Sequence, residues 1–367
     1  MDPRVREHAE IVVDHSTEIE AGDNVVVSAA SAAEDLTLAL CETIGERGAF
    51  PFHVSFRNDR TRAAFLDAAA PEDIDTPDHE LALAEAADVW IHVRAHDNVA
   101  DMSAVDSETM AAFRTAQLPV REEILDTTWV LTQYPAPADA QNAEMSTGEY
   151  EEFVWSAIGK DWDEQKRHQR QMVDILDAGE EVHIVSGDTT DLRMSIEGMT
   201  TINDHAKNNL PGGEVFTAPV ADSVEGEVLF DKPLIHEGHE VDDGYLRFED
   251  GEVVEYSASK NEDVLGQILD TDEGARRLGE LGIGMNRDID RFTYNMLFDE
   301  KMGDTIHLAV GRAYDECLPE GETGNESAVH VDMIVDMAED SYIEVDGEIV
   351  QRNGTFRFED GFEESEA

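Results

Sequence analysis

The chain contains little cysteine and no long apolar run. Only Cys41 and Cys317 occur in 367 residues, so we expect neither a disulfide framework nor a cysteine-rich metal site. No apolar run approaches the roughly 20 residues that span a bilayer. The N-terminus also lacks the charged-then-apolar order of a signal peptide. These absences predict a soluble protein of the cytoplasm.

Basic residues are scarce as well. Lysine and arginine together number 26, and only six of these are lysines, against 84 acidic residues, which gives a net charge of −58. A compact state of this charge repels itself in dilute buffer, whereas at about 1 M salt the Debye length shrinks to roughly 3 Å. We therefore expect a halophilic protein from a salt-rich cytoplasm, with neither nucleic acid nor anionic membranes as partners.

The first half of the chain alternates helical and strand-like segments. Strands are expected near residues 23–27, 52–56, 89–93, 129–131 and 182–185, with helices over 4–18, 32–47, 103–115 and 150–176. Strands separated by helices are typical of a parallel βαβ sheet. No Gly-x-Gly-x-x-Gly follows the first strand, so a dinucleotide site is not expected.

The pattern changes near residue 186, where glycine, aspartate and threonine become frequent. Short alternating strands are expected over 192–196, 226–230, 245–248 and 252–256, and one helix over 262–278. The sequence therefore predicts an α/β domain with a largely parallel sheet over residues 1–185. A mainly antiparallel β domain with a few helices, of the α+β type, is predicted over residues 186–367.

A histidine and an aspartate stand out in the apolar, strand-like run 328–335. Side chains alternate along a strand, so His330 and Asp332 share one face with Ile334. Burying an unpaired carboxylate is very costly, and a cation bound by both side chains would compensate it. For this segment alone, a core histidine–aspartate pair or a strand with one wet face is a somewhat simpler interpretation.

Another strand-like run, residues 304–311, is apolar or small after its first two residues except for one histidine. His307 shares its face with Ala309 and Gly311, whose small size leaves room for a ligand beside the imidazole. A hydrogen-bonded core histidine is the alternative. Tyr314 follows seven residues later and could donate a hydroxyl hydrogen bond to developing negative charge, although a packed aromatic ring would explain it equally simply.

Two glutamates are also set apart from the many surface acids. Glu280 shares a strand face with Gly282 and Gly284, and glycine in a strand often marks the close approach of a ligand or another backbone. A salt bridge to one of the two preceding arginines is the alternative. Glu214 follows a Pro-Gly-Gly turn at the start of a short apolar strand, where it is either a rigidly presented carboxylate or an exposed acid.

Together, the two glutamates, the two histidines and the aspartate form a possible set of metal ligands without thiolates. Carboxylate and imidazole ligands suit Zn, Co or Mn. Five ligands, three of them carboxylates, exceed what one four-coordinate zinc usually takes from a protein. They fit two ions roughly 3.5–4 Å apart with one bridging carboxylate. We therefore expect two divalent metal ions in the second domain.

Four segments in order carry a family resemblance: NLPGGEVFTAP at 209–219, GELGIG at 279–284, HLAVGRAY at 307–314 and HVD at 330–332. They resemble the aminopeptidase T/aminopeptidase S family of dinuclear metallo-aminopeptidases, closely in the second domain and more loosely in the first. The resemblance implies a homodimer whose active sites face an enclosed interior, acting on short peptides. It implies Tyr314 near the scissile bond and metal ligation by Glu214, Glu280, His307, His330 and Asp332.

The resulting hypothesis is release of N-terminal residues by a water activated between two metals. In it Glu280 bridges the ions, Tyr314 stabilises the oxyanion, and either glutamate takes the proton of the water. Alternatives are another dinuclear hydrolase, such as a phosphoesterase or amidase, a glycosidase that uses two of the carboxylates, and a non-catalytic peptide-binding protein.

Overall fold

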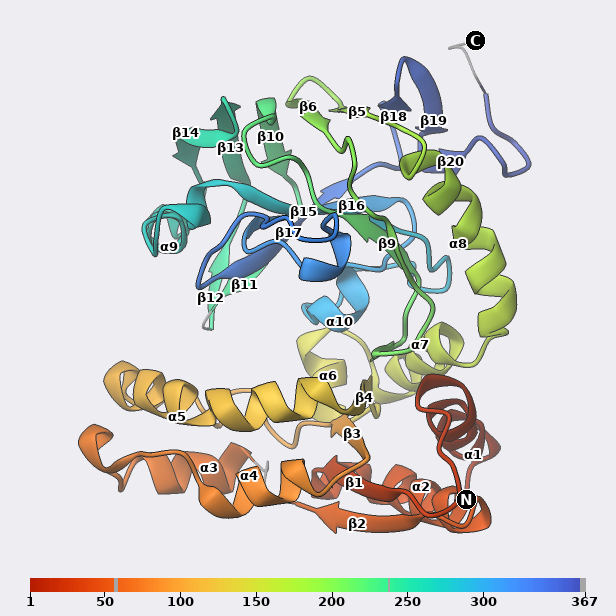
Figure 1. Cartoon of the computed structure of the whole chain (residues 1–367), viewed down its shortest axis with the longest axis vertical. Coiled ribbons are helices and arrows are strands. Elements are labelled where there is room, and N and C mark those ends of the chain that lie inside the picture. The colour runs from red at the N-terminus through yellow and green to blue at the C-terminus, as the bar shows by residue number, and fades with distance from the viewer. Residues whose placement is uncertain (56–58, 237, 364–367) are drawn as a thin grey trace. The chain divides into compact units, whose positions relative to one another are not determined.

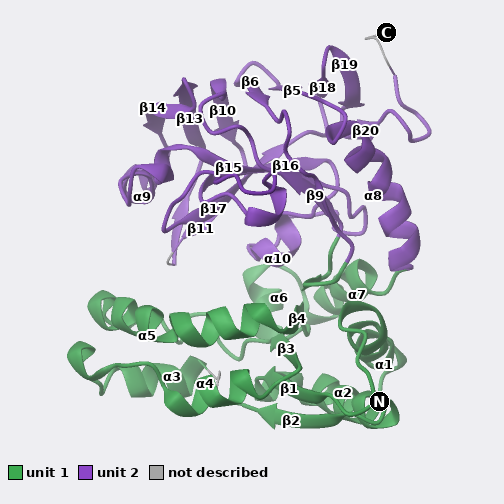
Figure 2. Cartoon of the chain, viewed as in Figure 1, with its two compact units in different colours: residues 1–160, 206–212 green, residues 161–205, 213–367 purple. Residues whose placement is uncertain are grey.

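The computed structural model describes residues 1–55, 59–236 and 238–363 (Figure 1). The chain forms two compact units, which Figure 2 distinguishes by colour. The first comprises Met1–Lys160 and Ala206–Gly212, and the second comprises Asp161–His205 and Gly213–Ala367. Each unit has its own sheet architecture.

The first unit contains a parallel sheet, as predicted. Its strands are β1 (Asn24–Ala29), β2 (Phe50–Val54), β3 (Val89–Arg94), β4 (Thr128–Gln133) and β8 (Asn209–Leu210), in the order β2-β1-β3-β4-β8. All four pairings are parallel. Of the strand predicted over 52–56, Phe56 lies outside the described residues. The strand order reverses at β1, because β2 and β3 pair with its two opposite edges.

Helices connect these strands. They are α1 (Pro3–Glu10), α2 (Glu34–Glu46), α3 (Asp59–Leu66), α4 (Asp78–Glu85), α5 (Ser107–Asp126), α6 (Pro137–Asn142) and α7 (Thr147–Ile158). Capping residues explain several starts: the side chains of Asp2, Asp106 and Ser146 accept backbone N–H bonds in the first turns of α1, α5 and α7.

The second unit contains an eight-stranded sheet in the order β14-β13-β10-β6-β5-β18-β19-β20. Its strands are β5 (Glu181–Ser186), β6 (Thr190–Ser195), β10 (Glu225–Phe230), β13 (Gly244–Glu249), β14 (Glu252–Ser257), β18 (Ser341–Val345), β19 (Glu348–Arg352) and β20 (Thr355–Phe356). The pairings are antiparallel. A separate antiparallel pair consists of β11 (Leu234–His236) and β12 (His239–Val241).

A five-stranded antiparallel sheet completes the second unit, in the order β17-β16-β15-β9-β7. Its strands are β7 (Ile202–Asp204), β9 (Glu214–Thr217), β15 (Leu278–Gly284), β16 (Thr305–Gly311) and β17 (His330–Asp336). The helices of this unit are α8 (Trp162–Leu176), α9 (Glu262–Leu269) and α10 (Met296–Asp299). The predicted mainly antiparallel domain is confirmed.

The two antiparallel sheets share one apolar core. Val182 and Val228 of the larger sheet belong to the same buried cluster as Leu281, Ile283 and Leu308 of the smaller one. Because side chains alternate along a strand, Glu280 and Gly282 on β15 lie on the face away from this core. The opposite face of the five-stranded sheet is therefore available for polar groups.

Three predictions about segments were wrong. The helix predicted over 150–176 is interrupted, because α7 ends at Ile158 and Asp161 caps a new helix, α8. The helix predicted over 262–278 ends at Leu269, and β15 begins at Leu278. The strand predicted at 182–185 was assigned to the parallel sheet, but β5 pairs with β6 and β18 in the antiparallel one.

The division between the units also differs from the boundary predicted after residue 185. Helix α8 packs against β7 and β9 of the second unit, so the division comes earlier, at residue 160. The short segment Ala206–Gly212 belongs to the first unit because β8 pairs with β4. No helix in the described part of the chain has both the length and the apolar composition needed to cross a bilayer.

Candidate metal centre

Strand register brings the predicted residues together on the five-stranded sheet. Glu280 of β15 lies opposite Ala309 of β16, which in turn lies opposite Asp332 of β17. His307 lies opposite Gly282. A Cβ atom built on Gly282 would stand only 1.9 Å from His307 Nε2, so the imidazole occupies the space that glycine leaves. The predicted close approach at this glycine is that of a side chain.

Glu280, His307 and Asp332 form the centre of the cluster. Each offers a ligand atom, and these atoms lie within 4.8 Å of one another. His307 Nε2 is 2.9 Å from Glu280 Oε1. His330 Nε2 lies 3.5 Å from Glu280 Oε2 and 3.4 Å from Asp332 Oδ1. The structure therefore places four of the five predicted ligands in one continuous group.

The His330 ring is oriented by the backbone. Its Nδ1–H donates to the carbonyl oxygen of Arg312 at 2.8 Å, which requires the proton on Nδ1. The Nε2 side of the ring then faces the carboxylates, and after loss of its proton this atom is free to bind a metal. Histidines that bind metals commonly donate their other ring N–H to a carbonyl or carboxylate in this way.

Glu214 joins the cluster from β9. Its Oε2 lies 3.4 Å from His307 Nε2, and its Oε1 lies 2.9 Å from Lys301 Nζ. Glu214 is nearly fully buried, as is Glu280. All five predicted ligands therefore form one continuous set on adjacent strands.

Tyr314 lies beside the cluster. Its ring centroid is 4.6 Å from that of His330 and 5.8 Å from that of Phe216. The residue is 45% exposed, the most accessible of the predicted group. Desolvation of the hydroxyl and the negative charge of Glu280 raise its pKa, so Tyr314 remains a neutral O–H donor.

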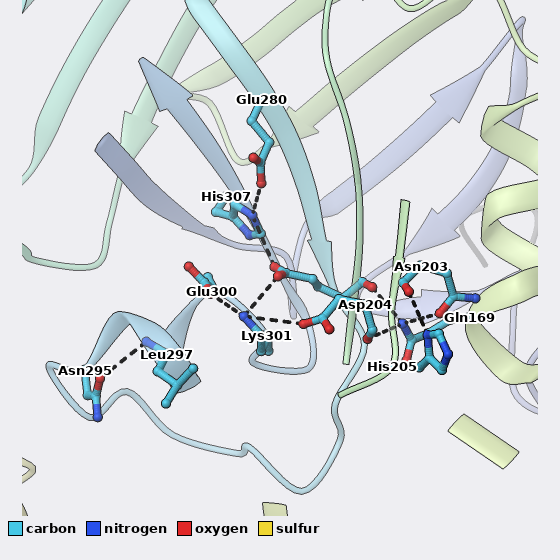
Figure 3. Close-up of polar contacts among 11 residues, drawn as sticks. Gln169, Asn203, Asp204, His205, Glu280, Asn295, Leu297, Glu300, Lys301 and His307 are labelled. Atoms are coloured by element: carbon cyan, nitrogen blue, oxygen red, sulfur yellow. Dashed lines mark hydrogen bonds and ion pairs between the residues drawn. The ribbon is translucent and has the colours of Figure 1, made fainter. Parts of the chain in front are cut away.

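Lys301 and Asp204 also belong to the site, although no sequence pattern predicts them. Lys301 follows helix α10, is completely buried, and contacts Glu300 and Glu214, with Asp204 Oδ2 at 3.8 Å (Figure 3). Gln169 of α8 donates from Nε2 to the carbonyl oxygens of Glu214 and Asp204, at 2.7 and 2.9 Å. One of only six lysines thus supports a candidate ligand, and that scarcity was the signal available in the sequence.

Burial and mutual contact shift the pKa values of this cluster. Desolvation raises the pKa of Glu214 and of Glu280. Burial alone would lower the pKa of both histidines, but their acidic neighbours raise it to about 10 for His307 and about 9 for His330. For Asp332, burial is outweighed by the hydrogen bond from His330, which lowers its pKa. The cluster therefore favours additional positive charge.

The residues fit a bound metal. Glu214 Oε2 and Glu280 Oε2 are buried and have no hydrogen-bond partner. Buried polar atoms of this kind are expensive unless something pairs with them, and a cation among the carboxylates would do so. Oxygen and imidazole donors without thiolates suit divalent ions of the Zn, Co and Mn type.

Comparisons with known proteins agree with this chemistry. A family model described as thermophilic metalloprotease (M29) matches residues 1–356. Aminopeptidase 2 of Geobacillus stearothermophilus is 28% identical, over 96% of this chain and 97% of the relative. Aminopeptidase T of Thermus aquaticus is 30% identical, over 92% and 93%. The structure of wild-type AmpT from Thermus thermophilus superposes with a TM-score of 0.86 at 27% identity, covering 96% of this chain and 99% of that one.

Proposed function

Because the chain belongs to the thermophilic metalloprotease (M29) family and is a metal-dependent aminopeptidase, we propose that its five clustered residues hold two divalent ions. The ligands are Glu214, Glu280, His307, His330 and Asp332. The observation that carries this assignment is their continuity on adjacent strands, with buried oxygen atoms left without partners. Five donors with three carboxylates are more than one four-coordinate zinc takes from protein.

Divalent ions held by these residues would supply an activated water and polarise the substrate carbonyl. Glu280 is the proposed bridging ligand, because its Oε1 lies next to His307 and its Oε2 next to His330. Zn, Co and Mn all match this donor set.

The side chains around the ions have separate proposed tasks. Tyr314 donates its O–H to the oxyanion that develops on the substrate, since it is accessible and remains protonated. Lys301 Nζ pairs with Oε1 of Glu214, which leaves Oε2 facing the cluster. Glu214 or Glu280 accepts the proton of the water. The carboxylates also attract the ammonium group of a peptide's N-terminus, which supports short peptides as substrates.

The setting of the enzyme is part of the proposal. Exposed apolar side chains in the first unit support a homodimer, because association would cover them: Leu38, Phe50, Phe52 and Phe65. The net charge of −58 supports a salt-rich cytoplasm as its location. Gel filtration across a range of KCl concentrations tests the dimer and the need for salt, and a stable monomer at every concentration would contradict the dimer.

The central experiment measures metal content and hydrolysis together, in KCl sufficient for folding. EDTA treatment should abolish release of p-nitroaniline from leucine p-nitroanilide, and Zn, Co or Mn should restore it. Mass spectrometry of the restored enzyme should find two ions per chain. Hydrolysis of p-nitrophenyl phosphate in place of the anilide would favour a phosphoesterase, and activity that survives complete metal removal would refute the assignment.

A further inference from the structure

A second candidate site lies in the first unit, far along the chain from the metal ligands. The parallel sheet reverses its strand order at β1, with β2 on one edge and β3 on the other. In open α/β sheets, ligands bind outside the carboxyl ends of the strands at such a reversal. A cavity of about 240 Å³ occurs at this place, and the last residues of β1 and β3 line it.

The charge of this cavity is opposite to that of the chain. Acidic residues outnumber lysine and arginine by 84 to 26 in the whole sequence. The described residues that line the cavity include Arg62, Arg94, His92 and His96 but one carboxylate, Asp59. Asp139, outside the lining, pairs with His96, and Asp59 Oδ2 lies 3.9 Å from His96 Nε2, so the two arginines leave an excess of positive charge. A local reversal of this kind indicates a ligand of negative charge.

Two polar groups in the cavity lining are buried without a partner. Ser28, at the end of β1, is 1% exposed, and its Oγ makes no hydrogen bond. Arg62 Nε is likewise buried and makes none. A buried donor without an acceptor is destabilising by roughly 1–3 kcal/mol, so both groups favour an acceptor in the cavity.

His96 and Arg62 are held in place by neighbours. Asp139 accepts two hydrogen bonds from His96, from Nδ1–H at 2.6 Å and from the backbone N–H at 3.0 Å. The first of these bonds raises the pKa of His96 despite partial burial. Arg62 pairs with Asp59 at 3.4 Å and packs its guanidinium 5.7 Å from the centre of the Phe113 ring. These donors are therefore pre-positioned.

We propose that this cavity binds an oxyanion, the carboxylate or phosphate group of a small molecule, through Ser28, Arg62 and His96. The hydroxyl, the guanidinium and the imidazole supply the donors that such a group accepts. The cavity is smaller than the roughly 300–1,000 Å³ typical of drug-sized ligands, so it takes a small molecule or one end of a larger one. This inference does not depend on the peptidase assignment.

Equilibrium dialysis of the full-length, metal-loaded protein tests the proposal. One arm uses radiolabelled inorganic phosphate, and the other uses N-acetylglycine, a carboxylate without a free amine. We expect one saturable site per chain for at least one probe, and the probe that binds identifies the source of the oxyanion. Ser28→Ala and Arg62→Gln should each weaken it about tenfold or more.

Controls separate this site from the metal centre. Arg170→Gln removes an exposed arginine that pairs only locally with Asp174, and it should leave binding unchanged. Peptidase activity and the circular dichroism spectrum of Ser28→Ala and Arg62→Gln should match those of the wild type. Absence of saturable binding for both probes would overturn the proposal. Binding that persists in both cavity variants but disappears in Glu280→Gln would overturn it too, because it would belong to the metal centre.

Discussion

The sheets of the two units place polar chemistry at different points along their strands. In the parallel sheet, β1 is apolar in its middle, and the groups that line the cavity lie at or beyond the strand end. In the five-stranded antiparallel sheet, Glu280 and His307 lie within strands in which every residue is buried. Sheets with helices on both faces leave only their ends for ligands, whereas a sheet with one face on the core can use the other.

Polar groups within a buried strand and polar groups at a strand end differ in the partners that they need. A charged group in the middle of a buried strand needs a compensating partner. Glu214 has Lys301 as that partner, and the carboxylates of the central group have the two histidines and, by our proposal, the metals. Polar groups at the strand ends need less compensation of this kind. Substitutions in the antiparallel sheet should therefore have the larger effects on activity and stability.

The largest effect is expected for Glu280→Gln. It removes the charge at the centre of the cluster and one ligand oxygen, so peptidase activity should fall by at least about 10³-fold and the metal content should fall with it. Activity assays and mass spectrometry of bound metal measure both. Glu252→Gln on the exposed edge of β14 is the matched control and should behave as wild type. Undiminished turnover by Glu280→Gln would exclude it as a ligand.

Lys301→Met should have the next largest effect, on stability. The substitution leaves Glu214, Glu300 and Asp204 without their buried cation, which should lower the free energy of unfolding by about 3–5 kcal/mol. Urea unfolding in KCl measures it. Lys260→Met is the control, since its ion pairs are exposed and worth about 1 kcal/mol or less. Equal losses in the two variants would contradict a special role for Lys301.

Gly282→Ala tests the close packing between β15 and β16. The added methyl group would stand 1.9 Å from His307 Nε2, so the ring must move, at a loss of about 1–3 kcal/mol and of metal affinity. Thermal unfolding and metal titration measure these effects. Gly148→Ala in α7 meets nothing within 4 Å and should instead stabilise by about 0.4–1 kcal/mol. Unchanged metal affinity in Gly282→Ala would show that the ring position is not critical.

The smallest expected effect concerns His8 in the first unit. Its Nε2 lies 2.7 Å from Thr132 Oγ1, which itself donates to the carbonyl of Leu210. Burial lowers the pKa of His8 from 6.5 to about 3. Below about pH 6.5 the unfolded chain therefore binds a proton at His8, whereas the folded chain does not. The free energy of unfolding consequently decreases as the pH falls below about 6.5.

Between about pH 7 and about pH 5.5 this loss should be on the order of 1 kcal/mol. Urea midpoints measured across that range detect it. In His8→Gln the corresponding part of the pH dependence should vanish. An identical slope in the variant and the wild type would assign the acid sensitivity to other groups.

The parts of the site that depend on neighbours in sequence were predictable, and the parts that depend on contacts between distant residues were not. A period of two and the neighbouring glycines place Glu280 and His307 on the polar face of the sheet, because strand alternation is a local property. The role of Lys301 arises from contacts with Glu214 and Asp204, which are distant in sequence, and no local pattern encodes it. The lining of the cavity at Ser28 likewise becomes visible only when β1 and β3 pair.

The fold shows the same limit. Alternating helices and strands identified the parallel sheet, and turn-rich alternation identified the antiparallel one. The two-residue strand β8 is too short to carry any period, yet it determines which unit residues 206–212 belong to. The helix break after Ile158 was missed because the flanking segments are both strongly helical and only the Asp161 cap separates them.

The place of β8 in the sheet constrains the order in which the units can be completed during synthesis. The parallel sheet remains one strand short until residues 209–210 have been made, long after the other four strands. By then β5, β6 and β7 of the other unit have also been synthesised. Domains commonly fold one after another from the N-terminus as they emerge. Here neither unit is a contiguous stretch, so both units are incomplete at this stage of synthesis. A truncation that isolates residues 1–160 likewise leaves the outer edge of β4 without its partner strand.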